Sequence, residues 1–249
     1  MKALITGASS GIGADVARVL SKEGCDLILV ARRKGKLEKL KKELDTEVEI
    51  IEMDVSSTYN CMQLYNKVKK QDIDILINNA GFGLCGSFDK ANLDKELDMI
   101  DLNVKTVHTL TKLFLKDFKK KDKGYILNVA SSAGFMPGPL MATYYATKSY
   151  VLNLSEAIYE ELRREGSNVS ISILCPGPVD TEFNKVAKVE FSMKGLNSYD
   201  VAKYAIKKMF KEKLIIIPSF KMKVAIFFTK LMPRKSLLKV TYNIQKKKQ

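Results

Sequence analysis

The sequence predicts an α/β fold: a doubly wound parallel sheet of about seven strands, in a single domain. Two observations lead to it. Short runs rich in β-branched residues alternate with longer amphipathic stretches, which is typical of parallel strands joined by helices on both faces. The length of 249 residues is sufficient for one large domain whose core needs no disulfide or metal support.

The elements follow in order along the chain. Runs of apolar and β-branched residues predict buried strands at 2–6, 26–31, 47–53, 73–78, 125–130, 168–174 and, as a late seventh, 213–219. Amphipathic periodicity predicts helices over 13–24, 35–45, 58–71, 96–121 and 142–165. We therefore expect a domain over 1–219 and a separate tail over 220–249.

Composition excludes several classes of protein. The first apolar run stops at Gly7, too early for a signal peptide or a membrane span, so we expect a cytoplasmic protein. Cysteines stand at 25, 61, 85 and 175 without a CxxC pair, which favours reduced thiols. His108 is the single histidine and has apolar neighbours, so we expect it to pack in the structure. No metal site is expected.

The turn “TGASSGIG”, residues 6–13, follows the first expected strand and precedes the first expected helix. Its glycines permit a tight turn and close approach of the backbone to a phosphate, which would face the positive end of the helix. This context predicts a dinucleotide site in a Rossmann-type fold. The expected contacts are Thr6, Gly7, Ser9, Ser10, Gly11, Ile12 and Gly13.

The end of the second expected strand predicts the cofactor. An acidic residue there would bind the ribose 2′-hydroxyl of NAD, but the chain has Ala31 followed by Arg32 and Arg33. Guanidinium groups form charge-assisted hydrogen bonds with a phosphate. We therefore predict NADP (NADPH), with Arg32 as the primary contact; Arg33 is either a second contact or a solvated residue at the start of a helix.

Four separated motifs together resemble the short-chain dehydrogenase/reductase family, in its NADP-preferring type. Besides the glycine turn they are “NNAG” at 78–81, “PGPVDT” at 176–181 and a Tyr-x-x-x-Lys pair. The resemblance extends over residues 2–218 and implies an oxidoreductase acting on a CH–OH group. It also implies cofactor contacts from Asp54, Val55, Asn79, Ala80, Gly81, Tyr144, Lys148, Pro176, Gly177, Val179 and Thr181.

Helix spacing leaves two tyrosines as partners of one lysine. Tyr144 and Tyr145, four and three residues before Lys148, share its helix face, whereas Tyr150 does not. The family pattern requires three residues between Tyr and Lys and a serine at a fixed distance before the tyrosine. It therefore selects Tyr144 with Ser131, and Tyr145 is assigned to packing.

The resemblance implies that Asn103, Ser131, Tyr144 and Lys148 are catalytic. A free tyrosine titrates near ~10, and the Lys148 ammonium with the positive nicotinamide ring would lower that pKa. Tyr144 would then give its proton to the carbonyl oxygen during reduction, while Ser131 hydrogen-bonds the same oxygen. Lys148 would bind the nicotinamide ribose and pass protons through water to Asn103.

Two segments are expected beside the substrate: the loop 134–141, and a lid at about 182–198. Both are rich in apolar residues, which favours an apolar ketone or aldehyde, such as a lipid-like, steroid or 3-oxoacyl carbonyl. The alternative is that these residues pack the lid against the domain. They are Phe135, Met136, Leu140, Met141, Phe183 and Met193.

The tail 220–249 mixes apolar residues with lysines, and the last fifth of the chain carries nearly all of the net charge of +14. A peripheral contact with an anionic membrane is one expectation; a lid or subunit contact is the other. No nucleic-acid motif is present. The family usually forms homodimers or homotetramers. The alternative to an enzyme is a non-catalytic NADP-binding sensor or scaffold, recruited through the tail.

Overall fold

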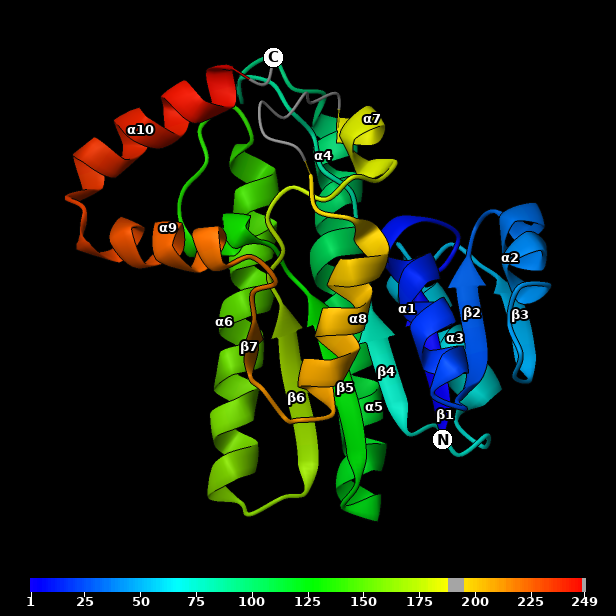
Figure 1. The fold of residues 1–249 in the computed structure, drawn as a ribbon. Helices are drawn as coiled ribbons and strands as arrows, with labels where there is room; N and C mark the ends of the chain where they lie inside the picture. Colours follow the sequence, from blue (N-terminus) through cyan, green and yellow to red (C-terminus); the bar gives the residue numbers. More distant parts are fainter. Residues whose placement is uncertain (188–194, 248–249) are drawn as a thin grey trace.

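A seven-stranded parallel sheet forms the centre of the computed structural model, which describes residues 1–187 and 195–247 (Figure 1). The strand order is β3-β2-β1-β4-β5-β6-β7, so the predicted doubly wound sheet is confirmed. The strands are β1 (Lys2–Thr6), β2 (Asp26–Ala31), β3 (Val48–Glu52), β4 (Ile75–Asn78), β5 (Gly124–Val129), β6 (Val169–Leu174) and β7 (Ile215–Ile216).

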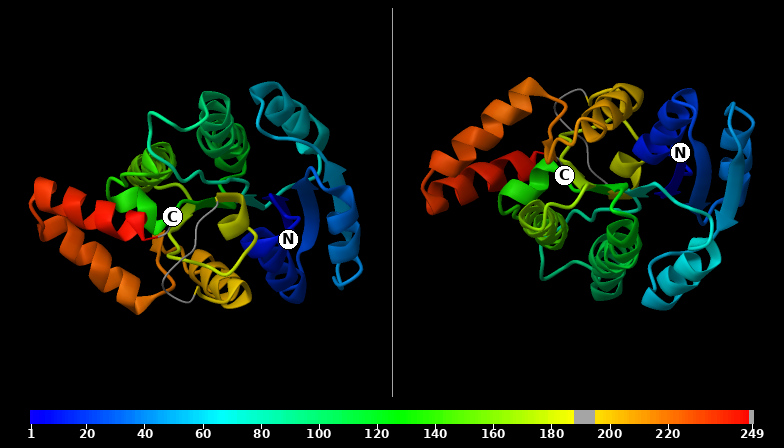
Figure 2. Two further views of the ribbon diagram at one scale, coloured as in Figure 1. Left: turned by 90° about the horizontal axis from the view of Figure 1, so that it is seen from above. Right: turned by 90° about the horizontal axis from the view of Figure 1, so that it is seen from below.

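Helices cover both faces of the sheet, as the end-on views in Figure 2 show. They are α1 (Gly11–Lys22), α2 (Lys34–Lys41), α3 (Thr58–Val68), α4 (Leu93–Ile100), α5 (Val107–Lys121), α6 (Ala142–Arg164), α7 (Phe183–Ala187), α8 (Ser198–Met209), α9 (Phe220–Leu231) and α10 (Arg234–Lys246). A π-helical turn, η1 (Asp101–Thr106), and a 3₁₀ turn, η2 (Ser132–Phe135), complete the described elements.

Alternate residues of the central strand enter different cores. Ala3, Leu4 and Ile5 of β1 are fully buried. Ala3 and Ile5 pack with residues of α1 and α8, whereas Leu4 packs with residues of α3 and α5, because successive side chains of a strand point to opposite faces. The sheet is therefore buried on both sides, which explains why its strands read as continuous apolar runs.

The helix expected over 96–121 is wrong in detail. The helical run begins at Leu93, where the Asn92 side chain accepts a hydrogen bond from the Lys95 amide, and the turn η1 interrupts it. Within η1, Thr106 Oγ1 donates to the backbone oxygens of Asp101 and Val55. These bonds depend on the tertiary fold, so the periodicity of the sequence could not predict the interruption.

The tail forms two helices, α9 and α10, separated by Met232 and Pro233. Ile226 of α9 is buried, as are Leu237 and Gln245 of α10. The two helices project from the β7 side of the sheet, and the end of α10 returns over the carboxyl ends of the strands (Figures 1 and 2). The tail is thus attached to the domain along one side of each helix.

Two expectations about single residues have different outcomes. His108 does not pack in the interior: its side chain is exposed and its Nδ1 lies 2.7 Å from the Tyr150 hydroxyl. The apolar residues around it face the core from the other side of α5. The four cysteines are unbridged, and three of them are buried, with Cys85 half-buried.

We predict that Gly13→Ala destabilises the fold. An added Cβ would lie 2.4 Å from Asn79 Nδ2 and 2.5 Å from the Gly7 carbonyl oxygen, so the backbone of α1 must shift. Overpacking of this kind costs about 1–3 kcal/mol, measured as the unfolding free energy in urea. Gly35→Ala in α2 is the control, since no neighbour lies within 4 Å and alanine favours a helix; an equal effect of both changes would contradict the packing argument.

Candidate active site

The glycine turn joins β1 to α1 at the carboxyl edge of the sheet. Gly7 and Gly11 have φ angles of +66° and +54°, a region that favours glycine. Ser10 precedes α1 and makes no side-chain hydrogen bond to its first amides. The backbone donors at the start of α1 are therefore not engaged by a capping side chain, which fits a phosphate group.

Asn79 holds the turn against the segment after β4. Its Nδ2 donates to the backbone oxygens of Thr6 and Gly7, at 3.1 and 3.2 Å. In return, Thr6 Oγ1 accepts from the amides of Asn79 and Ala80. Gly81 follows at a position where a Cβ would lie 2.8 Å from Asn103 Oδ1 and 3.4 Å from Lys148 Nζ. The predicted cofactor residues of β1 and β4 thus form one connected surface.

Ser131, Tyr144 and Lys148 lie together, next to Asn103. Ser131 lies close enough to Tyr144 to act on the pKa of its phenol, and Lys148 Nζ lies 5.9 Å from the centroid of the Tyr144 ring. Lys148 Nζ also donates to the Val129 oxygen at the end of β5, at 2.9 Å. The arrangement has a phenol, a hydroxyl and an amine in one buried place, so it could pass a proton to a substrate oxygen.

Asn103 stands in the π-helical turn and clamps the segment after β4. Its Nδ2 donates to the Phe82 oxygen at 2.9 Å, and its Oδ1 accepts from the Phe82 amide at 3.1 Å. A further bond joins Nδ2 to Thr147 Oγ1 on α6, at 3.1 Å. π-helical turns are frequent at functional sites, and this one brings the asparagine into contact with both α6 and the segment after β4.

Burial dominates the electrostatics of the site. It raises the pKa of Tyr144 to about 12, although the nearby Ser131 hydroxyl acts in the opposite direction. It also lowers the pKa of Lys148 to about 8. The expected lowering of the tyrosine pKa is therefore not seen in the protein alone, because desolvation disfavours the charged form of both groups.

The two arginines after β2, both expected near the cofactor, have different surroundings in the structure. Arg33, not Arg32, lies against the glycine turn: its guanidinium donates to Ser9 Oγ at 3.0 Å and to Ser10 Oγ at 2.8 Å. Arg32 is 72% exposed and lies 3.6 Å from Asp54. Asp54 also accepts a hydrogen bond from the amide of Ser56. Of the two arginines, Arg33 is thus the one that contacts the glycine turn.

The segment after β6 lies between the glycine turn and the tail. The Pro176 oxygen accepts from the Ser132 amide at 2.8 Å, and Val179 is buried. A Cβ on Gly11 would lie 3.0 Å from the Thr181 side chain, and a Cβ on Gly177 would lie 2.7 Å from Met222 of α9. The segment therefore faces the glycine turn at Thr181 and the tail at Gly177.

Apolar side chains surround Tyr144. Of the substrate residues expected from the sequence, Met141 and Phe183 belong to this cluster, and the Phe183 ring centroid lies 5.5 Å from that of Tyr144. Phe135 packs in a different cluster, Leu140 has a left-handed φ of 64°, and Met193 lies outside the described residues. Sequence reasoning missed the remaining members, which are Phe82, Leu84, Cys85, Met99, Ala133 and Ala187.

Tyr145 packs beside Tyr144, and it also contacts the tail. The two tyrosine rings meet edge to face at 6.1 Å, which agrees with the packing role assigned to Tyr145. The Gln245 side chain of α10 donates to the Tyr145 hydroxyl. Gln245 is almost fully buried, so the last helix forms part of the wall around the apolar cluster.

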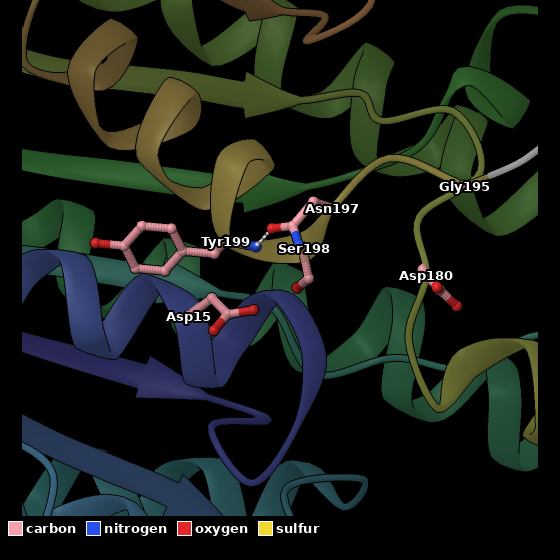
Figure 3. Close-up of a pocket in the computed structure, with 6 residues that line it drawn as sticks. All are labelled: Asp15, Asp180, Gly195, Asn197, Ser198 and Tyr199. Atoms are coloured by element: carbon pink, nitrogen blue, oxygen red, sulfur yellow. Dashed lines mark hydrogen bonds between the residues drawn. The ribbon is translucent and has the colours of Figure 1, made fainter.

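A hollow between α1 and the start of α8 is separate from these residues (Figure 3). Asn197 caps α8 there and accepts a hydrogen bond from the Tyr199 amide at 2.9 Å. None of the predicted catalytic residues lines it. Its lining residues are Asp15, Asp180, Gly195, Asn197, Ser198 and Tyr199. In the part of the chain that the structure describes, we find no cluster of three His, Cys, Asp or Glu suited to a metal ion.

Comparison with known proteins identifies relatives of this chain. The family model for short chain dehydrogenases matches residues 1–190. An uncharacterised oxidoreductase of Staphylococcus epidermidis is 35% identical over 182 residues, which is 72% of this chain and 78% of the relative. The very-long-chain 3-oxoacyl-CoA reductase of Homo sapiens is 31% identical over 194 residues, covering 75% of this chain and 62% of the relative.

A solved structure is also similar over most of its length. The short-chain dehydrogenase from Sphingobium yanoikuyae in complex with NADPH superposes with a TM-score of 0.83 at 30% sequence identity. The match covers 92% of this chain and 91% of that one.

We predict that Lys148→Met changes the pH dependence of stability. Below a pH of about 8 the ammonium is buried at a cost to the folded state; between about 8 and 10.5 the folded state releases the proton first, so the wild type gains stability. The gain of the wild type over the variant from pH 7 to 10 should approach about 3 kcal/mol. Urea unfolding at several pH values measures it. Lys203→Met, at an exposed position, is the control, and a difference that stays constant with pH would contradict the burial effect.

Proposed function

Because the chain belongs to the short-chain dehydrogenase family, we propose that it is an NADPH-dependent reductase of an apolar ketone or aldehyde, acting reversibly on the alcohol. That it is an oxidoreductase of the NAD(P)-dependent, carbonyl–alcohol type follows from the family. The choice of NADPH, the apolar substrate and the residue roles are our proposal. The observation that carries it is the contact of Ser131, Tyr144 and Lys148 beside Asn103.

The cofactor would supply the hydride, and the protein's residues would manage the proton. Tyr144 holds a proton on its hydroxyl at neutral pH, since burial raises its pKa to about 12. It would donate this proton to the carbonyl oxygen, and Ser131 would hydrogen-bond the same oxygen. Lys148, with a pKa of about 8, would bind the nicotinamide ribose and return a proton to the tyrosine, through water held by Asn103.

Two contacts support NADPH over NADH. Arg33 donates to both serines of the glycine turn, and with Lys36 it holds the carboxylate of Glu182. Arg33 and Lys36 therefore already bind one anionic group, the carboxylate of Glu182, in the folded protein. A 2′-phosphate suits the same donors, and the relative from Sphingobium yanoikuyae was solved with NADPH. Arg33 replaces Arg32 as the primary contact in our proposal.

The cluster around Tyr144 supports an apolar substrate. Its members come from five separate segments, and the rings of Phe183 and Tyr145 pack against the ring of Tyr144. A sugar or small acid would meet few polar partners there, and unpaired polar groups are costly to bury. The human relative is named for a 3-oxoacyl substrate, and a long acyl or similarly apolar carbonyl fits this wall.

The outer face of α9 supports a membrane contact. Phe220, Val224, Phe227 and Leu231 recur at helical spacing and are all exposed, with Phe228 beside them; we call these five residues the α9 stripe. Such a stripe normally faces a core. Residues 220–249 carry nine Lys and Arg and no Asp or Glu, so pairing of two stripes would bring cations together. An anionic bilayer surface complements both features.

The membrane contact would be peripheral. No described helix is long and apolar enough to cross a bilayer. A cytoplasmic location stays a prediction. Assembly as a homodimer or homotetramer is also a prediction, and analytical ultracentrifugation can test it. The tail also lines the apolar cluster through Gln245, so the proposed membrane contact and a role as a wall of the substrate site are compatible.

We predict that Tyr144→Phe lowers kcat for reduction of apolar ketones by about 10²–10⁴-fold, the usual contribution of a general acid. NADPH oxidation with a panel of apolar ketones and aldehydes measures it. Tyr145→Phe is the matched control, and its effect should be mild. A larger loss in Tyr145→Phe would reverse the assignment, and NADPH binding without turnover of any substrate would favour the sensor or scaffold.

We predict that Phe227→Ser/Phe228→Ser weakens binding to anionic vesicles about tenfold or more, because two exposed aromatic side chains lose their burial in lipid. Sedimentation with vesicles of phosphatidylcholine and phosphatidylglycerol in equal parts, against phosphatidylcholine alone, measures it. Phe88→Ser/Leu93→Ser removes exposed apolar residues elsewhere and should bind as the wild type does. Equal binding to both vesicle types, or no effect of the α9 change, would exclude the proposal.

A further inference from the structure

Three consecutive residues, Thr181, Glu182 and Phe183, contact three different parts of the proposed site. Thr181 lies against Gly11 of the glycine turn. Phe183 packs on the Tyr144 ring. Between them, Glu182 points to the start of α2, where its Oε2 lies 2.8 Å from Arg33 Nη1 and its Oε1 binds Lys36 Nζ. The two cations are more than a hundred residues from Glu182 in the sequence.

The two cations hold Glu182 firmly as a carboxylate. Hydrogen bonds from Lys36 and Arg33 lower the pKa of Glu182 to about 2. The same guanidinium donates to Ser9 and Ser10 through its remaining nitrogens. All three guanidinium nitrogens of Arg33 therefore donate hydrogen bonds in the folded protein, to a carboxylate and to two hydroxyls.

We propose that Glu182 is an internal competitor for the 2′-phosphate of the cofactor and thereby sets how strongly the protein distinguishes NADPH from NADH. The inference rests on the proposed NADPH preference. In this proposal a 2′-phosphate binds Arg33 and Lys36, the two cations that Glu182 already pairs with. The negative charge of the phosphate also repels the carboxylate of Glu182. A 2′-hydroxyl needs neither cation. Glu182 therefore weakens the binding of NADPH but not that of NADH, and so reduces the difference between the affinities for these two cofactors.

The size of the effect follows from the exposure of the ion pairs. Glu182, Arg33 and Lys36 are each more than 40% exposed, and exposed pairs contribute little because water and salt screen them. Loss of the carboxylate charge should therefore strengthen binding of the phosphorylated nucleotide by about two- to tenfold. The gain should shrink as the ionic strength rises.

Calorimetric titration with two nucleotide fragments tests the proposal. Adenosine 2′,5′-bisphosphate and adenosine 5′-monophosphate differ by the 2′-phosphate alone and require no turnover. Glu182→Gln should bind the bisphosphate about two- to tenfold more tightly than the wild type and the monophosphate equally. Asp180→Asn is the matched control, since it changes the net charge equally at an exposed position two residues away. It should leave the ratio of the two affinities unchanged.

Each contrary result has a separate meaning. If the wild type prefers the bisphosphate but Glu182→Gln leaves that preference unchanged or lowers it, the carboxylate positions Arg33 and does not compete, and the proposal is overturned. If Asp180→Asn gives the same gain, the effect is one of net charge, which also overturns it. Equal binding of both fragments by all three proteins would overturn the NADPH preference itself, and the role of Glu182 with it.

Discussion

The segment that leaves β4 is held by the amide groups of two asparagines, and the geometry of the whole site depends on these bonds. Asn79 fastens it to the turn after β1, and Asn103 fastens it to α6 through Phe82 and Thr147. Buried amides must find partners, since an unpaired polar group in the interior is costly. The nucleotide turn and the phenol of Tyr144 are thereby kept at a fixed separation.

Most of the fold could be predicted from the sequence, because both faces of the sheet are buried. Each strand is then a continuous apolar run, and all seven expected strands are present, although β7 is shorter than 213–219. The break between α9 and α10 could also have been predicted, since Pro233 disfavours a helical residue before it. The turn η1 could not, because it depends on bonds to Val55 and Phe82 across the fold.

A motif fixes the spacing of Ser131, Tyr144 and Lys148, so the sequence could predict that these three residues lie close together, as they do in the structure; their roles stay predictions. The site was not predictable where tertiary packing decides. The sequence could not show that, of the two arginines, Arg33 is the one that contacts the glycine turn; which of them binds the cofactor stays a prediction. The apolar wall draws on residues such as Leu84 and Met99, which share no sequence period. The pKa of the tyrosine was expected to fall, and desolvation, which no local pattern reports, raises it.

The number of residues in the π-helical turn decides where the side chains within it point. An α-helix advances by about 100° for each residue, and the wider turn at 101–106 accommodates its extra residue before Thr106. Loss of one codon within this stretch would close the turn to ordinary α geometry. The flanking helices α4 and α5 would keep their mutual orientation, and the side chains of the turn, Asn103 among them, would be displaced. The position of the Asn103 side chain therefore depends on the number of residues in the turn.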